Sequence, residues 1–148
     1  MKKISIIFLS FMTVLILLSF GYKINEGIRI SVTNVRSDRG TVLVSLFKDG
    51  VGFPDNPEKA VKRIKLSLSS NKAEVLFTNL TAGTYAVAIL HDENNDQKLN
   101  KNILGIPKEG FGFSNNVMGT FGPPSFTKAS FQHQQGQLTQ VTIRTKYF

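Results

Sequence analysis

The residues best suited to binding a ligand lie between positions 91 and 126, and the oxygen-bearing ones come first. From Asp92 onward an oxygen side chain recurs at alternate positions, with Lys98 as the interruption, and a further acid follows at 109. Hard cations such as Ca²⁺ need several such oxygens at once, and a loop with this spacing can bring them together. The candidate calcium ligands are Asp92, Asn94, Asp96, Asn100 and Glu109.

The same segment departs from an EF-hand loop at two decisive places. Gln97 occupies the position where that loop needs glycine, and Ile103 stands where a bidentate glutamate belongs. A looser calcium site completed by Glu109 or by backbone carbonyls therefore stays open. The alternative is an Asx-rich turn, whose side chains bind their own backbone.

His91 next to Asp92 raises the question of a hydrolase, with Ser114 as its nucleophile. Neighbouring residues on a strand point to opposite faces, so His91 and Asp92 do not form a dyad by adjacency alone. Ser114 lacks a nucleophile-elbow sequence around it. We therefore expect no enzyme, and a hydrolase centred on His91 is the least favoured alternative.

Aromatic residues alternate with glycine in the second half of this segment, at Phe111, Phe113, Phe121 and Phe126. Exposed rings beside asparagine amides suit a sugar or a peptide, because stacking and amide hydrogen bonds both recognise such ligands. The competing interpretation is that the rings anchor a long loop across the sandwich. The ligand-binding candidates are His91, Phe111, Phe113, Ser114 and Asn115.

Composition and the N-terminus indicate where the protein acts. A basic start and an uncharged apolar run predict that residues 1–23 are a signal peptide, with an uncleaved membrane anchor as the alternative. We expect export to the periplasm or the cell surface and one domain over residues 24–148. The formal net charge of +8 favours an anionic envelope polymer, a glycan or a peptide as partner, whereas export disfavours nucleic acid.

Short strands separated by turn residues cover the rest of the chain. The first two, joined through Gly40, predict a hairpin. The strand before His91 is apolar on both faces and is expected to be central. The predicted strands are residues 27–33, 41–47, 61–68, 73–77, 84–90, 126–131 and 138–144, with one long structured loop over 91–126.

Two stretches resemble known families. Residues 75–87 resemble the F-x-x-L-x-x-G-x-Y-x-V signature of transthyretin-like, carboxypeptidase-regulatory-like sandwiches. Residues 91–94, 105–115 and 121–126 resemble domain-of-unknown-function family 2141, a family of bacterial exported proteins that brings no established activity. Where that family tends toward Asn-Gly-Lys-Leu-Asp, this chain reads Asp-Gln-Lys-Leu-Asn over 96–100.

We therefore expect an all-β fold: an antiparallel, seven-stranded Greek-key sandwich of transthyretin-like or immunoglobulin-like type, preceded by a signal helix. The expected function is a non-catalytic binding or structural module of the cell envelope, possibly stabilised by calcium. A carbohydrate- or peptide-binding module that uses the aromatic loop is the first alternative. The membrane is expected to be a partner only through an uncleaved N-terminal segment.

Overall fold

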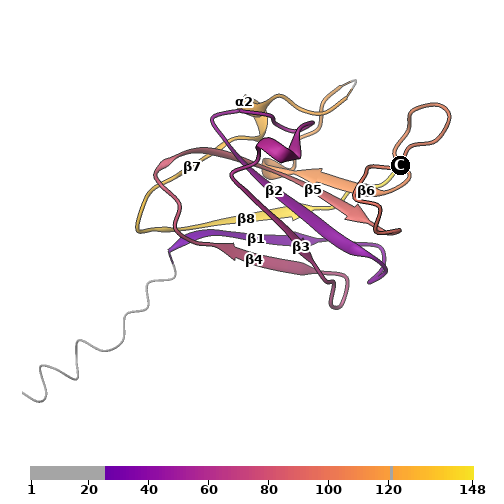
Figure 1. Cartoon of the computed structure of the whole chain (residues 1–148), viewed down its shortest axis with the longest axis horizontal. Helices are drawn as coiled ribbons and strands as arrows, with labels where there is room; N and C mark the ends of the chain where they lie inside the picture. Colours follow the sequence, from indigo (N-terminus) through magenta and orange to yellow (C-terminus); the bar gives the residue numbers. More distant parts are fainter. Residues whose placement is uncertain (1–25, 121) are drawn as a thin grey trace, which may run out of the picture.

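The computed structural model describes residues 26–120 and 122–148, and over these ranges the chain forms two facing β-sheets (Figure 1). This confirms the predicted all-β sandwich. The predicted signal helix, within residues 1–23, lies outside the described residues. Among the described residues, no helix has the length and apolar character needed to cross a bilayer.

The smaller sheet has the spatial order β4 (Ala73–Phe77), β1 (Gly27–Thr33) and β8 (Leu138–Arg144). The larger sheet has the order β3 (Lys62–Leu66), β2 (Thr41–Lys48), β5 (Gly83–Asp92) and β6 (Gly110–Phe113), and β7 (Phe131–His133) also pairs with β5. The described helices are short: η1 (Pro57–Lys59), η2 (Ser114–Asn116) and α2 (Phe126–Ala129).

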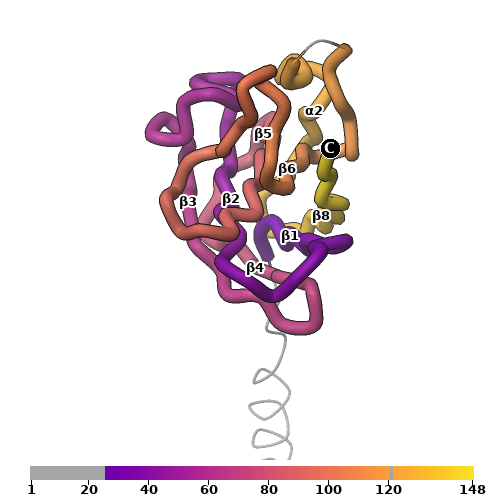
Figure 2. Tube along the Cα trace, turned by 90° about the vertical axis from the view of Figure 1, so that its right-hand side faces the viewer, coloured from indigo at the N-terminus to yellow at the C-terminus, as the bar shows by residue number. Residues whose placement is uncertain are grey.

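Alternating residues of β1, β2 and β5, together with Ile143 of β8, fill the space between the sheets. In Figure 2, where the strands are seen nearly end-on, β4 and β1 lie below β5, and β8 lies to the right of β2. The predicted inward residues of β1 are all buried, and every second residue of β2 and β5 meets them. The principal core side chains are Ile28, Ile30, Val32, Val42, Val44, Leu46, Tyr85, Val87, Ile89 and Ile143. Period-two patterning therefore identified the faces of these strands correctly.

The predicted hairpin between the first two strands is wrong, because β1 and β2 belong to different sheets. β1 pairs with β4 in antiparallel fashion and with β8 in parallel, with Ile30 opposite Val141. β2 pairs with β3 and with β5, where Val44 lies opposite Ile89. The sandwich is thus not wholly antiparallel, and the segment between β1 and β2 crosses from one sheet to the other.

Two predicted strands are shorter than expected. Residues 126–131 do not form one strand, because Phe126–Ala129 is a single helical turn and only Phe131–His133 pairs with β5. β3 stops at Leu66, and its Ile64 is 38% exposed because β3 is the free edge of the larger sheet in the described structure.

The segment expected to be one loop, residues 91–126, contains a strand. β6 pairs with β5, with Phe111 opposite Leu90. Its glycines face the core: a Cβ on Gly110 would lie 2.4 Å from the Tyr147 ring, and one on Gly112 would lie 2.8 Å from Ile143. The alternation of glycine and phenylalanine therefore lets the C-terminal segment pack closely on the inner face of β6. The rings of Phe111 and Phe113 cover the outer face of this strand.

The corner before β5 is fixed by a tyrosine. Tyr85 is buried and its hydroxyl donates to the Thr81 carbonyl at 2.7 Å. Phe77 is buried at the end of β4, and Leu80 packs against the same core. These contacts explain the spacing of Phe77, Leu80 and Tyr85 in the sequence.

Candidate functional site: an apolar groove on the outer face of the larger sheet

The outer face of the larger sheet is partly covered by a second apolar cluster. Ala86, Phe113 and Ala129 are buried there. Phe53 lies at the centre of the cluster, with its ring centroid 5.9 Å from those of both Phe113 and Phe126. Of the loop phenylalanines, Phe113 is therefore buried on this face, and Phe126 is partly buried beside it.

Beyond this cluster the same face is open and forms a groove of about 1190 Å³. Outward-facing residues of β2, β5 and β6 form its floor: Leu43, Ala88, Leu90 and Phe111. The C-terminal Phe148 stacks on Phe111, with centroids 5.8 Å apart and an interplanar angle of 28°. The walls come from Pro54, Pro57, Leu99, Leu104, Ile106, Pro107, Met118 and Pro123. This is a mainly apolar surface.

The charged residues on the rim of the groove are mostly basic. They are Asp55, Arg63, Lys98 and Lys101. Arg63 pairs with Glu58, whereas neither lysine forms an ion pair within the described residues. An apolar floor with a cationic rim complements a ligand that has an apolar body and an anionic group.

Two of the candidate calcium ligands are buried carboxylates that hold the loop backbone. Asp92 accepts the backbone N–H groups of Asp96 at 3.1 Å and Gln97 at 2.9 Å. Glu109 accepts those of Glu93 and Asn100, each at 3.0 Å. Each carboxylate therefore satisfies amide groups that the loop would otherwise leave without partners.

The other three candidates form an exposed ring of mutual hydrogen bonds. The Asn94 amide donates to Asp96 and Asn100, and the Asn100 amide donates to Asp96 at 2.8 Å. Hydrogen bonds from Asn100, the Lys98 backbone and Asn94 lower the pKa of Asp96. All five candidates thus lie in one loop, with contacts of the kind expected of an Asx-rich turn. The described residues contain no group of three His, Cys, Asp or Glu side chains arranged to hold a metal ion.

His91 lies on the inner face of β5, away from the groove, and both its ring nitrogens have partners. Nε2 lies 2.7 Å from the Arg39 carbonyl and Nδ1 lies 2.8 Å from the Tyr147 hydroxyl. A carbonyl only accepts, so Nε2 carries a proton, and in that tautomer of the imidazole Nδ1 is the acceptor for the Tyr147 hydroxyl. His91 and Asp92 point to opposite faces and make no dyad.

An ion pair covers this histidine. Arg36 lies over the Tyr147 ring, 4.6 Å from its centroid, and forms a forked pair with Glu93. Burial raises the pKa of Tyr147, and the hydrogen bond from Arg36 lowers the pKa of Glu93. The cluster ties β5 to the C-terminal segment.

Ser114 and Asn115 also serve the fold. Ser114 is fully buried, accepts the Val87 N–H at 2.9 Å and donates to the Ala129 carbonyl at 2.6 Å. The Asn115 amide donates to the carbonyls of Lys128 and Ser130. Among the five ligand-binding candidates, only Phe111 and Phe113 line the groove, and Phe113 is mostly buried.

Sequence reasoning missed most of the groove. Leu43, Leu90, Leu104, Ile106 and Phe148 were not among the candidate residues. The sequence did contain a signal for Leu43 and Leu90, because β2 and β5 carry apolar residues at outward as well as inward positions. Such a pattern indicates a sheet with a second apolar face.

Comparison with known proteins adds a family assignment. Neither the curated proteins nor the solved structures contain a match to this chain. Residues 30–141 match a family of uncharacterised proteins conserved in bacteria, DUF2141, and this range spans β1 to β8. Because the match covers most of the chain, the protein belongs to the DUF2141 family.

Proposed function

We propose that this protein is a non-catalytic binding module of the bacterial cell envelope, exported to the periplasm or cell surface, that holds the apolar part of an anionic amphipathic ligand in the groove. The observation that carries the proposal is the apolar outer face of the larger sheet. Leu43, Leu90 and Phe111 are only half-buried there, and Phe148 is 72% exposed. A soluble protein rarely keeps such a surface unless it is used.

The polar groups support binding over catalysis. His91 and Ser114 have the chemistry of a base and a nucleophile, but each makes two hydrogen bonds inside the protein. A catalytic site needs such groups free to meet a substrate in one place. The tyrosine corner at Tyr85 supports the further proposal of a transthyretin-like, Greek-key kinship.

A fluorescent long-chain fatty acid tests the proposal by titration into the purified protein. We expect saturable binding that Leu43→Glu abolishes, since it places a charge on the groove floor. Val51→Glu is the matched control, because Val51 is 58% exposed and lies outside the groove lining. Phe148→Ala is a second test that leaves the core intact and should weaken binding. Absence of saturable binding, or equal binding by all four proteins, would refute the proposal.

A glycan or peptide ligand is the second candidate, favoured by the exposed ring of Phe148 stacked on Phe111. Sugars stack on such rings, but they also need polar partners close by. A glycan array and a peptide library run with wild type and Phe148→Ala separate the candidates. Binding of a neutral sugar, lost in Phe148→Ala while the fatty acid fails to bind, would favour the glycan.

A further inference from the structure

Residues 100–108 form an ordered hairpin-like finger beside the groove. Its base is closed by the hydrogen bond from the Lys108 N–H to the Asn100 carbonyl at 2.8 Å, and a β-bridge joins Lys101 to Pro107. Near the tip, the Asn102 side chain accepts the N–H groups of Leu104 and Ile106 at 2.9 and 3.0 Å. The tip therefore has a defined shape maintained by its own hydrogen bonds.

This tip presents apolar side chains to solvent. Ile103 is 101% exposed, Leu104 is 78% exposed and Ile106 is 41% exposed. Single exposed apolar residues are ordinary, but three of them on four consecutive positions of an ordered projection form a patch. Because the tip is hydrogen-bonded, these side chains are held outward and cannot easily fold back onto the core.

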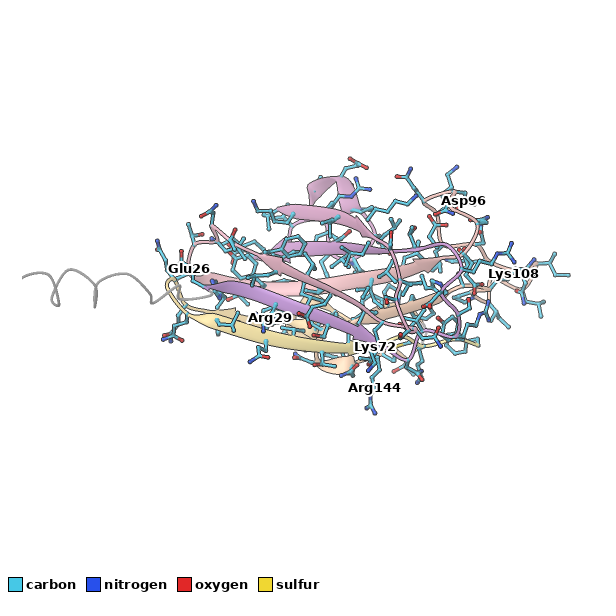
Figure 3. The ribbon with its side chains drawn as sticks, turned by 90° about the horizontal axis from the view of Figure 1, so that it is seen from below. Glu26, Arg29, Lys72, Asp96, Lys108 and Arg144 are labelled. Carbon is cyan, nitrogen blue, oxygen red and sulfur yellow. The ribbon has the colours of Figure 1, made fainter. Side chains whose placement is uncertain are left out.

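The base of the finger is cationic. Lys98, Lys101 and Lys108 are exposed, and none of them forms an ion pair with another described residue. Of the acids nearby in sequence, Glu93 pairs with Arg36 and Glu109 is buried against backbone amides, whereas Asp96 is exposed and is hydrogen-bonded by the Asn94 and Asn100 amides. Figure 3 shows Lys108 near one extremity of the molecule, opposite the end that carries Glu26.

We propose that this finger docks the protein on an anionic lipid bilayer. The tip residues Ile103, Leu104 and Ile106 enter the interfacial region, and the lysines contact lipid phosphates. An apolar tip with exposed lysines at its base matches the layering of such a surface, in which the anionic head groups lie outside the apolar chains. A narrow projecting tip also suits insertion better than it suits a broad protein interface.

Charge argues against a second copy of this chain as the occupant. The formal net charge is +8, so two fingers with their lysines facing each other would repel. The inference goes beyond the proposed groove function, although the two surfaces share Lys98, Lys101, Leu104 and Ile106. Ile103 and Lys108 belong to the finger alone and do not line the groove. The groove therefore opens beside the docked surface.

Co-sedimentation of the full chain with vesicles tests the docking. One set contains phosphatidylcholine alone and the other contains phosphatidylcholine mixed with phosphatidylglycerol. We expect binding to the anionic set, and we expect the double variant Ile103→Ser, Leu104→Ser to lower the partition coefficient at least tenfold, roughly. Val51→Ser, Val61→Ser is the matched control, because both valines are exposed on other segments. All variants retain the N-terminal apolar run, so any difference reports on the finger.

The electrostatic part is tested separately. Lys101→Gln, Lys108→Gln should weaken binding to anionic vesicles by about fivefold per lysine at low salt and leave binding to neutral vesicles unchanged. Phe148→Ala, which alters the groove alone, should bind vesicles as the wild type does. If only the groove proposal is wrong, the fatty acid fails to bind while vesicles still do. If only the docking proposal is wrong, the fatty acid binds and the tip variant sediments with vesicles as the wild type does.

A spectroscopic probe provides the decisive measurement, because the chain contains no tryptophan. Leu104→Trp places a single indole at the tip, and its emission should shift to shorter wavelength and be quenched by brominated lipids on anionic vesicles. Val51→Trp should show neither change. An unchanged Leu104→Trp spectrum, or equal vesicle binding by the wild type and the tip variant, would overturn the proposal. A dimer in ultracentrifugation that the tip variant dissociates would assign the finger to a second copy instead.

Discussion

Glu109→Gln tests whether the buried carboxylates hold the loop that carries the finger. Glu109 is 4% exposed, and its two oxygens accept the N–H groups of Glu93 and Asn100 at 3.0 Å. Glutamine keeps the shape but replaces one oxygen with an amide donor. In either orientation of the amide, one buried backbone N–H then faces another donor and loses its partner.

The expected loss in the free energy of unfolding follows from these two hydrogen bonds. A hydrogen bond to a charged acceptor contributes about 1.5–3 kcal/mol, and an unsatisfied buried donor costs about 1–3 kcal/mol. With one bond lost and the other made neutral, we expect Glu109→Gln to reduce the free energy of unfolding by about 2–4 kcal/mol. Urea denaturation measures this loss, and hydrogen exchange should accelerate first at the amides of Glu93 and Asn100.

Asp96→Asn is the matched control, because Asp96 is an exposed carboxylate in the same loop. We expect Asp96→Asn to destabilise the protein less than Glu109→Gln does, because the hydrogen bonds that Asp96 accepts are exposed to solvent. Adding calcium distinguishes a role of Glu109 as a backbone acceptor from a role as a metal ligand. If the carboxylate serves as a backbone acceptor, calcium and EDTA leave the melting temperature of wild type unchanged. A wild type that is stabilised by calcium, together with a Glu109→Gln variant that is not, would refute this reasoning and make Glu109 a metal ligand.

Three further predictions concern the packing around β6 and the C-terminal segment. Arg36 lowers the folded-state pKa of Glu93, so this ion pair stabilises the fold above the ordinary glutamate pKa. The stabilisation is lost as the pH falls through the lowered pKa of Glu93. Arg36→Gln should raise the pKa of Glu93 in an NMR titration and flatten the acid dependence of stability. Gly112→Ala should destabilise by about 1–3 kcal/mol in urea, since its Cβ would lie 2.8 Å from Ile143, and wild-type stability would contradict the close approach. The buried Thr145 hydroxyl has no hydrogen-bond partner among the described residues, so Thr145→Val should raise stability by about 1 kcal/mol, and a loss of stability would show that the hydroxyl is satisfied.

The faces of the strands were predictable from sequence, but their partners were not. Ile28, Ile30 and Val32 alternate in the same way whether β1 pairs with β2 or faces it across the core. Periodicity reports only which side is buried. Whether two strands pair in one sheet or face each other across the core depends on the path of the segment between them. Turn residues such as Gly40 fit a hairpin and a crossover equally well.

β6 was missed because its pattern comes from tertiary contacts. The two glycines of this short strand lower its strand propensity, and they indicate a loop when they are considered locally. Gly110 and Gly112 are required by the close approach of Tyr147 and Ile143, which lie far later in the sequence. The stacking of Phe148 on Phe111 is equally remote in sequence, so the groove could be predicted only in part.

The distribution of hydrogen-bonded and unpartnered groups supports the proposed binding function. His91, Ser114, Asp92 and Glu109 look reactive in the sequence, yet each makes two hydrogen bonds within the fold. A group used in this way is not free to attack a substrate or bind a ligand, because either step first breaks hydrogen bonds that maintain the structure. What the described surface leaves unsatisfied is apolar area on the groove and the finger tip, together with lysines that have no partner. Binding driven by burial and by positive charge uses both of these features, whereas a hydrolytic mechanism uses neither.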